Sequence, residues 1–217
     1  MQTNRLSIAT FLLALAGCLF TAPPCRAQSF HVLFDTSGLA GAAGGPFSLD
    51  FQLTDGSGTG DGNTTVTLSD FIGAALIGGP ATTGGVAGAL PGVMTMTDSA
   101  FFTEYTQVFT PGGVLQWDLA LNMTAPEVGP TPDEWTLGLL DGMGNEIPTT
   151  AANAAFLTID LTPNGPSIQT AGTPPGAEVV LAAPVVSAQA VVPEAGALGL
   201  FMAGLAATAF TRRFRRR

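Results

Sequence analysis

The stretch LQWDLALNM, residues 115–123, alternates large apolar side chains with polar or small ones. Successive side chains of a β-strand point to opposite faces, so this period of two predicts a strand with one buried and one solvated face. Residues 47–54, FSLDFQLT, show the same alternation. Shorter or less regular runs predict further strands at residues 30–34, 65–69, 93–96, 101–109, 135–139 and 157–161.

Clusters of Gly, Pro, Asn and Asp separate these runs, for example at residues 78–92 and 125–132. Several short strands with turn signals between them are typical of all-β domains. The chain is therefore predicted to be mainly β, with an antiparallel β-sandwich or jelly roll over residues 28–170. Residues 171–191 are rich in Ala, Pro and Val without a period, which predicts a linker with one edge strand, at residues 178–181.

The N-terminus has the layout of a secretory signal peptide over residues 1–27. A polar start with Arg5 precedes an apolar run at residues 6–20, and Cys25 and Ala27 suit the positions before a cleavage site. The predicted mature chain starts at Gln28 and contains neither of the 2 Cys. An alternative lies in residues 15–18, LAGC, which resemble the lipobox of bacterial lipoproteins and would place a lipid on Cys18.

The C-terminus carries an uncharged stretch, residues 195–211, followed by an arginine-rich tail. At about 1.5 Å per residue this stretch forms a helix of roughly 25 Å, near the lower limit for spanning a bilayer. Positive charge stays on the cytoplasmic side of a membrane. We therefore expect a transmembrane helix at residues 195–211, with the bulk of the chain outside.

The order of Val192-Pro193-Glu194, a short apolar helix and a terminal arginine cluster resembles the PEP-CTERM sorting signal over residues 192–217. In that family a membrane protease, the exosortase, recognises and cuts the signal in exopolysaccharide-producing Gram-negative bacteria. The family pattern has a second proline where this chain has Ala195. The residues that the resemblance assigns to sorting and processing are Val192, Pro193, Glu194, Arg212, Arg213, Arg215, Arg216 and Arg217.

Residues 47–71 and 132–150 also resemble a group of small secreted PEP-CTERM proteins that has no established activity. The two resemblances imply an exported, noncatalytic protein of the cell surface or extracellular matrix. Signal peptidase would cut between Ala27 and Gln28, the C-terminal helix would hold the precursor in the inner membrane, and an exosortase-type protease would process it. Extracellular polysaccharide is the implied partner.

The charges divide the chain into basic ends and an acidic middle. All 7 basic residues are arginines, none of them between Ala27 and Thr211, whereas every one of the 16 acidic residues except Glu194 lies within residues 28–193. Such a field attracts divalent cations. It disfavours nucleic acid, because that binding depends on Lys and Arg neutralising phosphates.

Residues 55–63, DGSGTGDGN, carry an oxygen-bearing side chain at every second position with glycine between. Calcium takes six to eight oxygen ligands, and these offsets match part of an EF-hand loop. Val66 stands where the bidentate Glu of that loop is required, so a nonstandard calcium loop and a mobile Gly-rich hairpin loop remain as alternatives. The candidate calcium ligands are Asp55, Ser57, Thr59, Asp61 and Asn63.

The sequence offers few residues suited to catalysis, since His31 is the single histidine and no Gly-x-Ser-x-Gly motif occurs. The alternative to a noncatalytic protein is a carbohydrate-binding module or a carboxylate-dependent glycoside hydrolase, with calcium as a possible cofactor. Carboxylates for that chemistry are Asp50, Asp118, Asp133, Glu134 and Asp160. Trp117, Trp135 and Tyr105 are predicted to pack in the core rather than to form a sugar-stacking platform.

Overall fold

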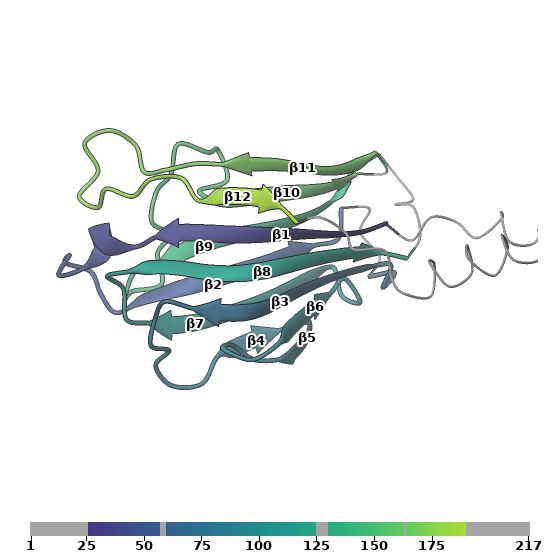
Figure 1. The fold of residues 1–217 in the computed structure, drawn as a ribbon, viewed down its shortest axis with the longest axis horizontal. Coiled ribbons are helices and arrows are strands. Elements are labelled where there is room, and N and C mark those ends of the chain that lie inside the picture. Colours follow the sequence, from purple (N-terminus) through teal and green to yellow (C-terminus); the bar gives the residue numbers. More distant parts are fainter. Residues whose placement is uncertain (1–25, 57–59, 125–129, 163, 190–217) are drawn as a thin grey trace, which may run out of the picture.

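Two antiparallel sheets of six strands each make up the part of the chain that the computed structural model describes, which is residues 26–56, 60–124, 130–162 and 164–189 (Figure 1). The first sheet contains, in spatial order, β12 (Val185–Ala188), β1 (Arg26–Asp35), β8 (Val114–Met123), β3 (Thr64–Ile72), β6 (Met94–Thr97) and β5 (Gly85–Gly88). The second sheet contains β11 (Gly165–Thr170), β10 (Leu157–Thr162), β9 (Asp133–Leu140), β2 (Phe47–Thr54), β7 (Phe102–Phe109) and β4 (Ala81–Thr83). A short 3-10 helix, Ser37–Leu39, follows β1. The prediction of a mainly β chain with a sandwich of antiparallel sheets is confirmed.

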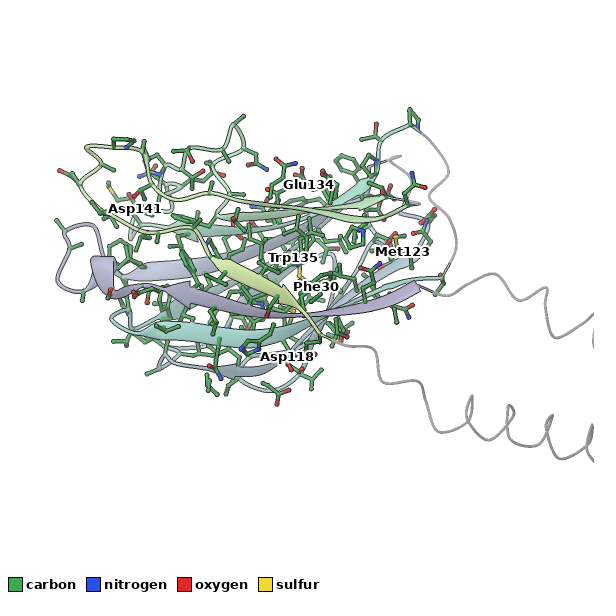
Figure 2. The ribbon with its side chains drawn as sticks, turned by 45° about the horizontal axis from the view of Figure 1, so that its top comes forward. Phe30, Asp118, Met123, Glu134, Trp135 and Asp141 are labelled. Atoms are coloured by element: carbon green, nitrogen blue, oxygen red, sulfur yellow. The ribbon has the colours of Figure 1, made fainter. Side chains whose placement is uncertain are left out.

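The alternation of β8 sets the faces of the first sheet. Trp117, Leu119 and Leu121 are buried, while the residues between them are less so. β1 pairs with β8 so that Val32 lies opposite Trp117, which puts the apolar residues of both strands on the same inner face. Asp118 points to the outer face of this sheet, and Glu134 lies on the opposite outer face of the sandwich (Figure 2).

An aromatic cluster joins the two sheets at the centre of the core. The ring of Phe51, on β2, lies 6.1 Å from that of Trp117 on the facing sheet, in an edge-on arrangement. On its own sheet it lies 5.8 Å from the ring of Trp135 and 6.2 Å from that of Tyr105. All four side chains are fully buried. The predicted core role of both tryptophans and Tyr105 is confirmed, and a sugar-stacking platform built from them is excluded.

The described part of segment 171–191 does not form the predicted linker. β12 pairs with β1, with Val186 opposite Val32, and Val179 and Leu181 are buried against the core. Residues 178–181 are not a strand, so the predicted edge strand is also wrong. The physical reason is that β1 would otherwise present an open sheet edge, and this apolar segment covers it.

β1 begins at Arg26, so Ala27 and Gln28 lie within the strand, opposite Asn122 and Leu121. The predicted cleavage between Ala27 and Gln28 would leave the rest of β1 paired with β8. Cys18, the sorting residues and the predicted helix at 195–211 lie outside the described residues. Among the residues that are described, no helix is long and apolar enough to cross a membrane.

Candidate metal centre

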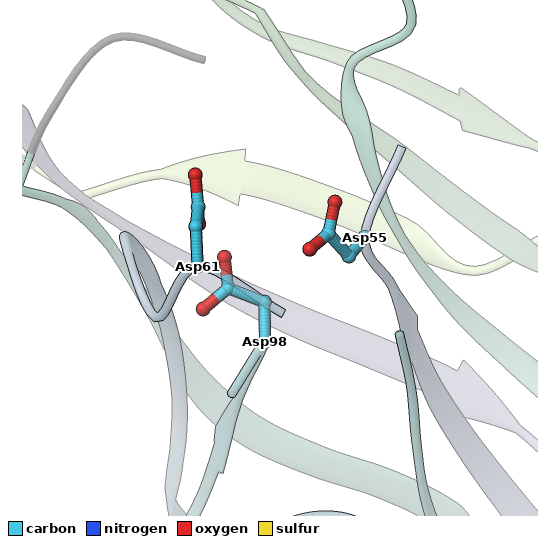
Figure 3. A group of neighbouring side chains, drawn as sticks. All are labelled: Asp55, Asp61 and Asp98. Carbon is cyan, nitrogen blue, oxygen red and sulfur yellow. The ribbon is translucent and has the colours of Figure 1, made fainter. Parts of the chain in front are cut away.

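Three carboxylates from two loops meet at one end of the sandwich (Figure 3). Asp55 directly follows β2, Asp61 precedes β3, and Asp98 directly follows β6. Each can present an oxygen such that the three oxygens lie within 4.8 Å of one another. We call Asp55, Asp61 and Asp98 the aspartate triad.

The loop between β2 and β3 crosses from one sheet to the other. β2 belongs to the second sheet and β3 to the first, so the interpretation of residues 55–63 as a hairpin loop is wrong. The crossing places Asp55 at the end of the second sheet and Asp61 at the start of a strand of the first. The aspartate triad therefore spans the two layers of the sandwich.

Backbone donors hold the triad in place. The N–H of Thr64 donates to both carboxylate oxygens of Asp98, each at 3.1 Å. This contact follows from the pairing of β3 with β6, in which Thr65 lies opposite Thr97. The N–H of Gly60 donates to Oδ2 of Asp55. Two of the three carboxylates are thus positioned by main-chain groups of the same crossing loop and its strand.

Asn63 supports Asp61 in the structure. Its Nδ2 donates to Oδ2 of Asp61 at 2.7 Å, and its backbone N–H donates to Oδ1 at 3.1 Å. Its own Oδ1 accepts a hydrogen bond from the Thr64 hydroxyl at 2.9 Å. The amide donor of Asn63 thus faces Asp61 in this arrangement, and its role as a calcium ligand stays a prediction.

The structure describes only some of the other residues that the sequence predicts as calcium ligands. Asp55 and Asp61 are brought together as predicted, whereas Ser57 and Thr59 lie outside the described residues. Val66, which replaces the Glu of an EF-hand, is a fully buried core residue of β3. Asp98 was missed, since only the pairing of β6 with β3 brings it to the loop.

Burial makes the triad electrostatically unfavourable without a counterion. Asp55 is 2% exposed and Asp98 is 0% exposed, while Asp61 is exposed. Burial and, to a smaller extent, the charges of Asp133 and Asp61 together raise the pKa of Asp98 to about 7. The sequence between Ala27 and Thr211 has no Lys or Arg to offset these charges.

A fourth carboxylate, that of Asp133, lies close behind the triad. It is 1% exposed, its Oδ1 accepts from the N–H of Gly56 at 3.0 Å, and its buried Oδ2 has no hydrogen-bond partner among the residues that the structure describes. A Cβ on Gly56 would lie 1.9 Å from the carbonyl oxygen of Pro132, so only glycine permits this close approach of the two chain segments. An unpartnered buried oxygen adds to the negative potential here.

The arrangement matches the needs of a hard divalent cation. Calcium binds oxygen ligands at about 2.3–2.6 Å, so two oxygens on one ion lie at most about 5 Å apart. The oxygens of the triad meet this limit. Carboxylates from two loops and two sheets would then share one positive charge centre, which removes their mutual repulsion.

The remaining carboxylates lie elsewhere. Asp118 pairs with His31 on the outer face of the first sheet, with Nδ1 and Oδ1 2.7 Å apart, and hydrogen bonds from Gln189 and His31 lower the pKa of Asp118. Asp50 lies within β2, where burial raises its pKa to about 6. Among the described residues, Asp118 bonds to His31 and Gln189, and Asp50 bonds to Gln52 and Thr106, so we treat both as separate from the aspartate triad.

Comparison with family models, with curated proteins and with solved structures finds no match for this chain.

Proposed function

We propose that the chain is an exported, noncatalytic β-sandwich protein of the cell surface or extracellular matrix, and that it binds calcium at the aspartate triad. The observation that carries the calcium proposal is the approach of three carboxylate oxygens to within 4.8 Å, two of them from buried residues, in a chain that has no Lys or Arg from Ala27 to Thr211. A bound cation would tie the end of β2 to the ends of β3 and β6. Calcium would thereby fasten the two sheets at one end of the sandwich.

Calcium is expected to raise the melting temperature of the full-length chain, purified in mild detergent at pH 8. At a free calcium concentration about 100 times the Kd, the expected stabilisation is about 2.7 kcal/mol. Asp98→Asn should abolish most of this gain. Asp61→Asn should do the same without a risk to the core, because Asp61 is exposed. Thermal melts and calorimetric calcium titrations measure both effects.

Asp70→Asn is the matched control, since Asp70 is an exposed carboxylate of β3 at a left-handed φ of 56°, a conformation that Asn tolerates. Its calcium response should equal that of the unaltered chain. A melting temperature that does not change with calcium up to millimolar concentrations would contradict the proposal that the aspartate triad binds calcium.

The export half of the proposal rests on the two end segments of the sequence. The signal peptide at 1–27 and the tripartite segment at 192–217 support passage across the inner membrane, a membrane-held precursor and a processed product. The last strand of the described residues, β12, ends at Ala188, which precedes the proposed recognition motif at Val192 in the sequence.

Intact-mass analysis of the protein recovered from outside the cell tests this half. We expect the mass of a chain that begins at Gln28 and lacks the tail with Arg212 to Arg217. A mature protein that retains the arginine tail would contradict processing, and a mass increased by a lipid on Cys18 would favour the lipoprotein alternative.

A further inference from the structure

Two cavities adjoin on the outer side of the second sheet and share Glu134. The larger has a volume of about 390 Å³ and a polar lining from Glu134, Thr150, Asn153, Thr158, Gln169 and Thr170. The smaller, about 350 Å³, is lined by Glu134, Asp160, Thr54, Asp55 and Phe101, among others. The smaller cavity borders the aspartate triad at Asp55, and the larger one lies over β9, β10 and β11; we call the two cavities, which meet at Glu134, the hollow.

Strand register places the polar side chains of this hollow on one face. Asp160 lies directly opposite Glu134, and Gln169 lies opposite Thr158. Their sequence neighbours Trp135 and Ile159 are fully buried, so Glu134 and Asp160 point to the other, outer face. Burial and then the charge of Asp160 raise the pKa of Glu134.

The loop before β10 is fixed by its own hydrogen bonds. Nδ2 of Asn153 donates to the Thr158 hydroxyl at 3.0 Å, and Oδ1 of Asn153 accepts from the N–H of Ala155 at 3.3 Å. Between them Ala154 is held in the left-handed region, at a φ of 54°. Because an alanine in this region is strained, the surrounding contacts must hold the loop in place. The wall of the larger cavity is thus formed before any ligand arrives.

Phe101 supplies an apolar surface in the smaller cavity. Its side chain is 59% exposed, although it lines the smaller cavity beside Glu134 and Asp160. A pocket with an aromatic side chain and a few convergent amides, hydroxyls and carboxylates suits a ligand that has both a flat apolar face and hydroxyl groups. A sugar ring has both.

We propose that this hollow binds a neutral polysaccharide chain, with one sugar ring against Phe101 and the hydroxyls of successive sugars bonded to Glu134, Asp160, Asn153 and Gln169. An anionic polymer is disfavoured, since the hollow is lined by carboxylates and by no Lys or Arg among the described residues. A small cation would use the carboxylates alone and would leave the amides and Phe101 without a role. The inference does not depend on calcium, although Asp55 borders both sites.

The test is calorimetric titration of the full-length chain in mild detergent with cellohexaose, laminarihexaose and mannohexaose, and with spermine and hexagalacturonate as charged comparisons. At least one neutral hexasaccharide should bind. Phe101→Ala and Gln169→Ala should each weaken it by about fivefold or more. Met143→Ala is the matched control, because Met143 is a large apolar residue that is 83% exposed and lies outside this hollow.

Binding should persist in Asp61→Asn, since Asp61 does not line either cavity. The Asp61→Asn variant therefore tests the calcium site without altering the polysaccharide site, so that either proposal can be contradicted without the other. Three outcomes overturn the inference: no binding of any neutral hexasaccharide by the folded chain, sugar affinity that Phe101→Ala and Gln169→Ala leave unchanged, or binding of spermine in preference to sugar.

Discussion

Replacing Phe51 by alanine is expected to lower the free energy of unfolding by about 3 to 5 kcal/mol. The side chain is fully buried and its ring contacts aromatic rings of both sheets, those of Trp117, Trp135 and Tyr105. Since strands β7, β8 and β9 hold these rings in place, the cavity left by the missing ring can close only partially. A domain of this size has about 5 to 15 kcal/mol of stability in total, so the variant should be close to unfolding.

Urea denaturation followed by tryptophan fluorescence measures this effect, because both tryptophans border the new cavity. Phe51→Leu keeps most of the apolar volume and should lose clearly less stability. Met143→Ala, at an exposed site, should change stability by no more than about 0.5 kcal/mol. If Phe51→Ala were as stable as Phe51→Leu, the ring would not be the packing centre that the structure indicates.

The period of two predicted the inner strands because each of them buries one face. Residues 47–54 and 115–123 alternate in the sequence, and the structure has β2 and β8 there. The edge strands β4 and β5 lie in the stretch 78–92, which was predicted as a turn region. These strands are short and mostly exposed, and main-chain bonds to β7 and β6 hold them. A strand of that kind needs no apolar pattern, so periodicity cannot detect it.

The same limit applies to the candidate sites. Asp55 and Asp61 could be proposed together since they lie in one loop, but Asp98 joins them only through the pairing of β6 with β3. Phe101 and the buried Tyr105 are an even number of positions apart, so alternation along a single strand would point both rings into the core. β7 begins one residue later, at Phe102, and Phe101 is exposed. Local patterns therefore find residues of the right type, whereas non-local strand pairing decides which of them meet.

Without calcium, the domain is expected to lose stability as the pH rises from about 4 to about 7. Asp98 has a pKa of about 7 in the folded chain and 3.8 as its ordinary value, so folding favours its protonated form. Its contribution is fully present below the unfolded pKa and is lost as the pH rises through the folded pKa. At 1.36 kcal/mol per pKa unit the loss is on the order of 4 kcal/mol. Asp50, whose pKa is raised to about 6, also loses its stabilising contribution as the pH rises, and this loss is complete about one pH unit below that of Asp98.

Calcium separates the contributions of Asp98 and Asp50 to the pH dependence, because it binds the ionised form of the triad, whereas Asp50 lies within β2, is 3% exposed and is not part of the triad. At saturating calcium the decline due to Asp98 should disappear, and the decline due to Asp50, between about pH 4 and 6, should remain. Asp98→Asn should show that same residual decline with or without calcium, since it has no proton to lose at this position. Urea denaturation from pH 4 to 8, with EDTA or with calcium, measures all four curves. A pH dependence of the unaltered chain that is identical with EDTA and with calcium would mean that the charge on Asp98 is not what the cation neutralises.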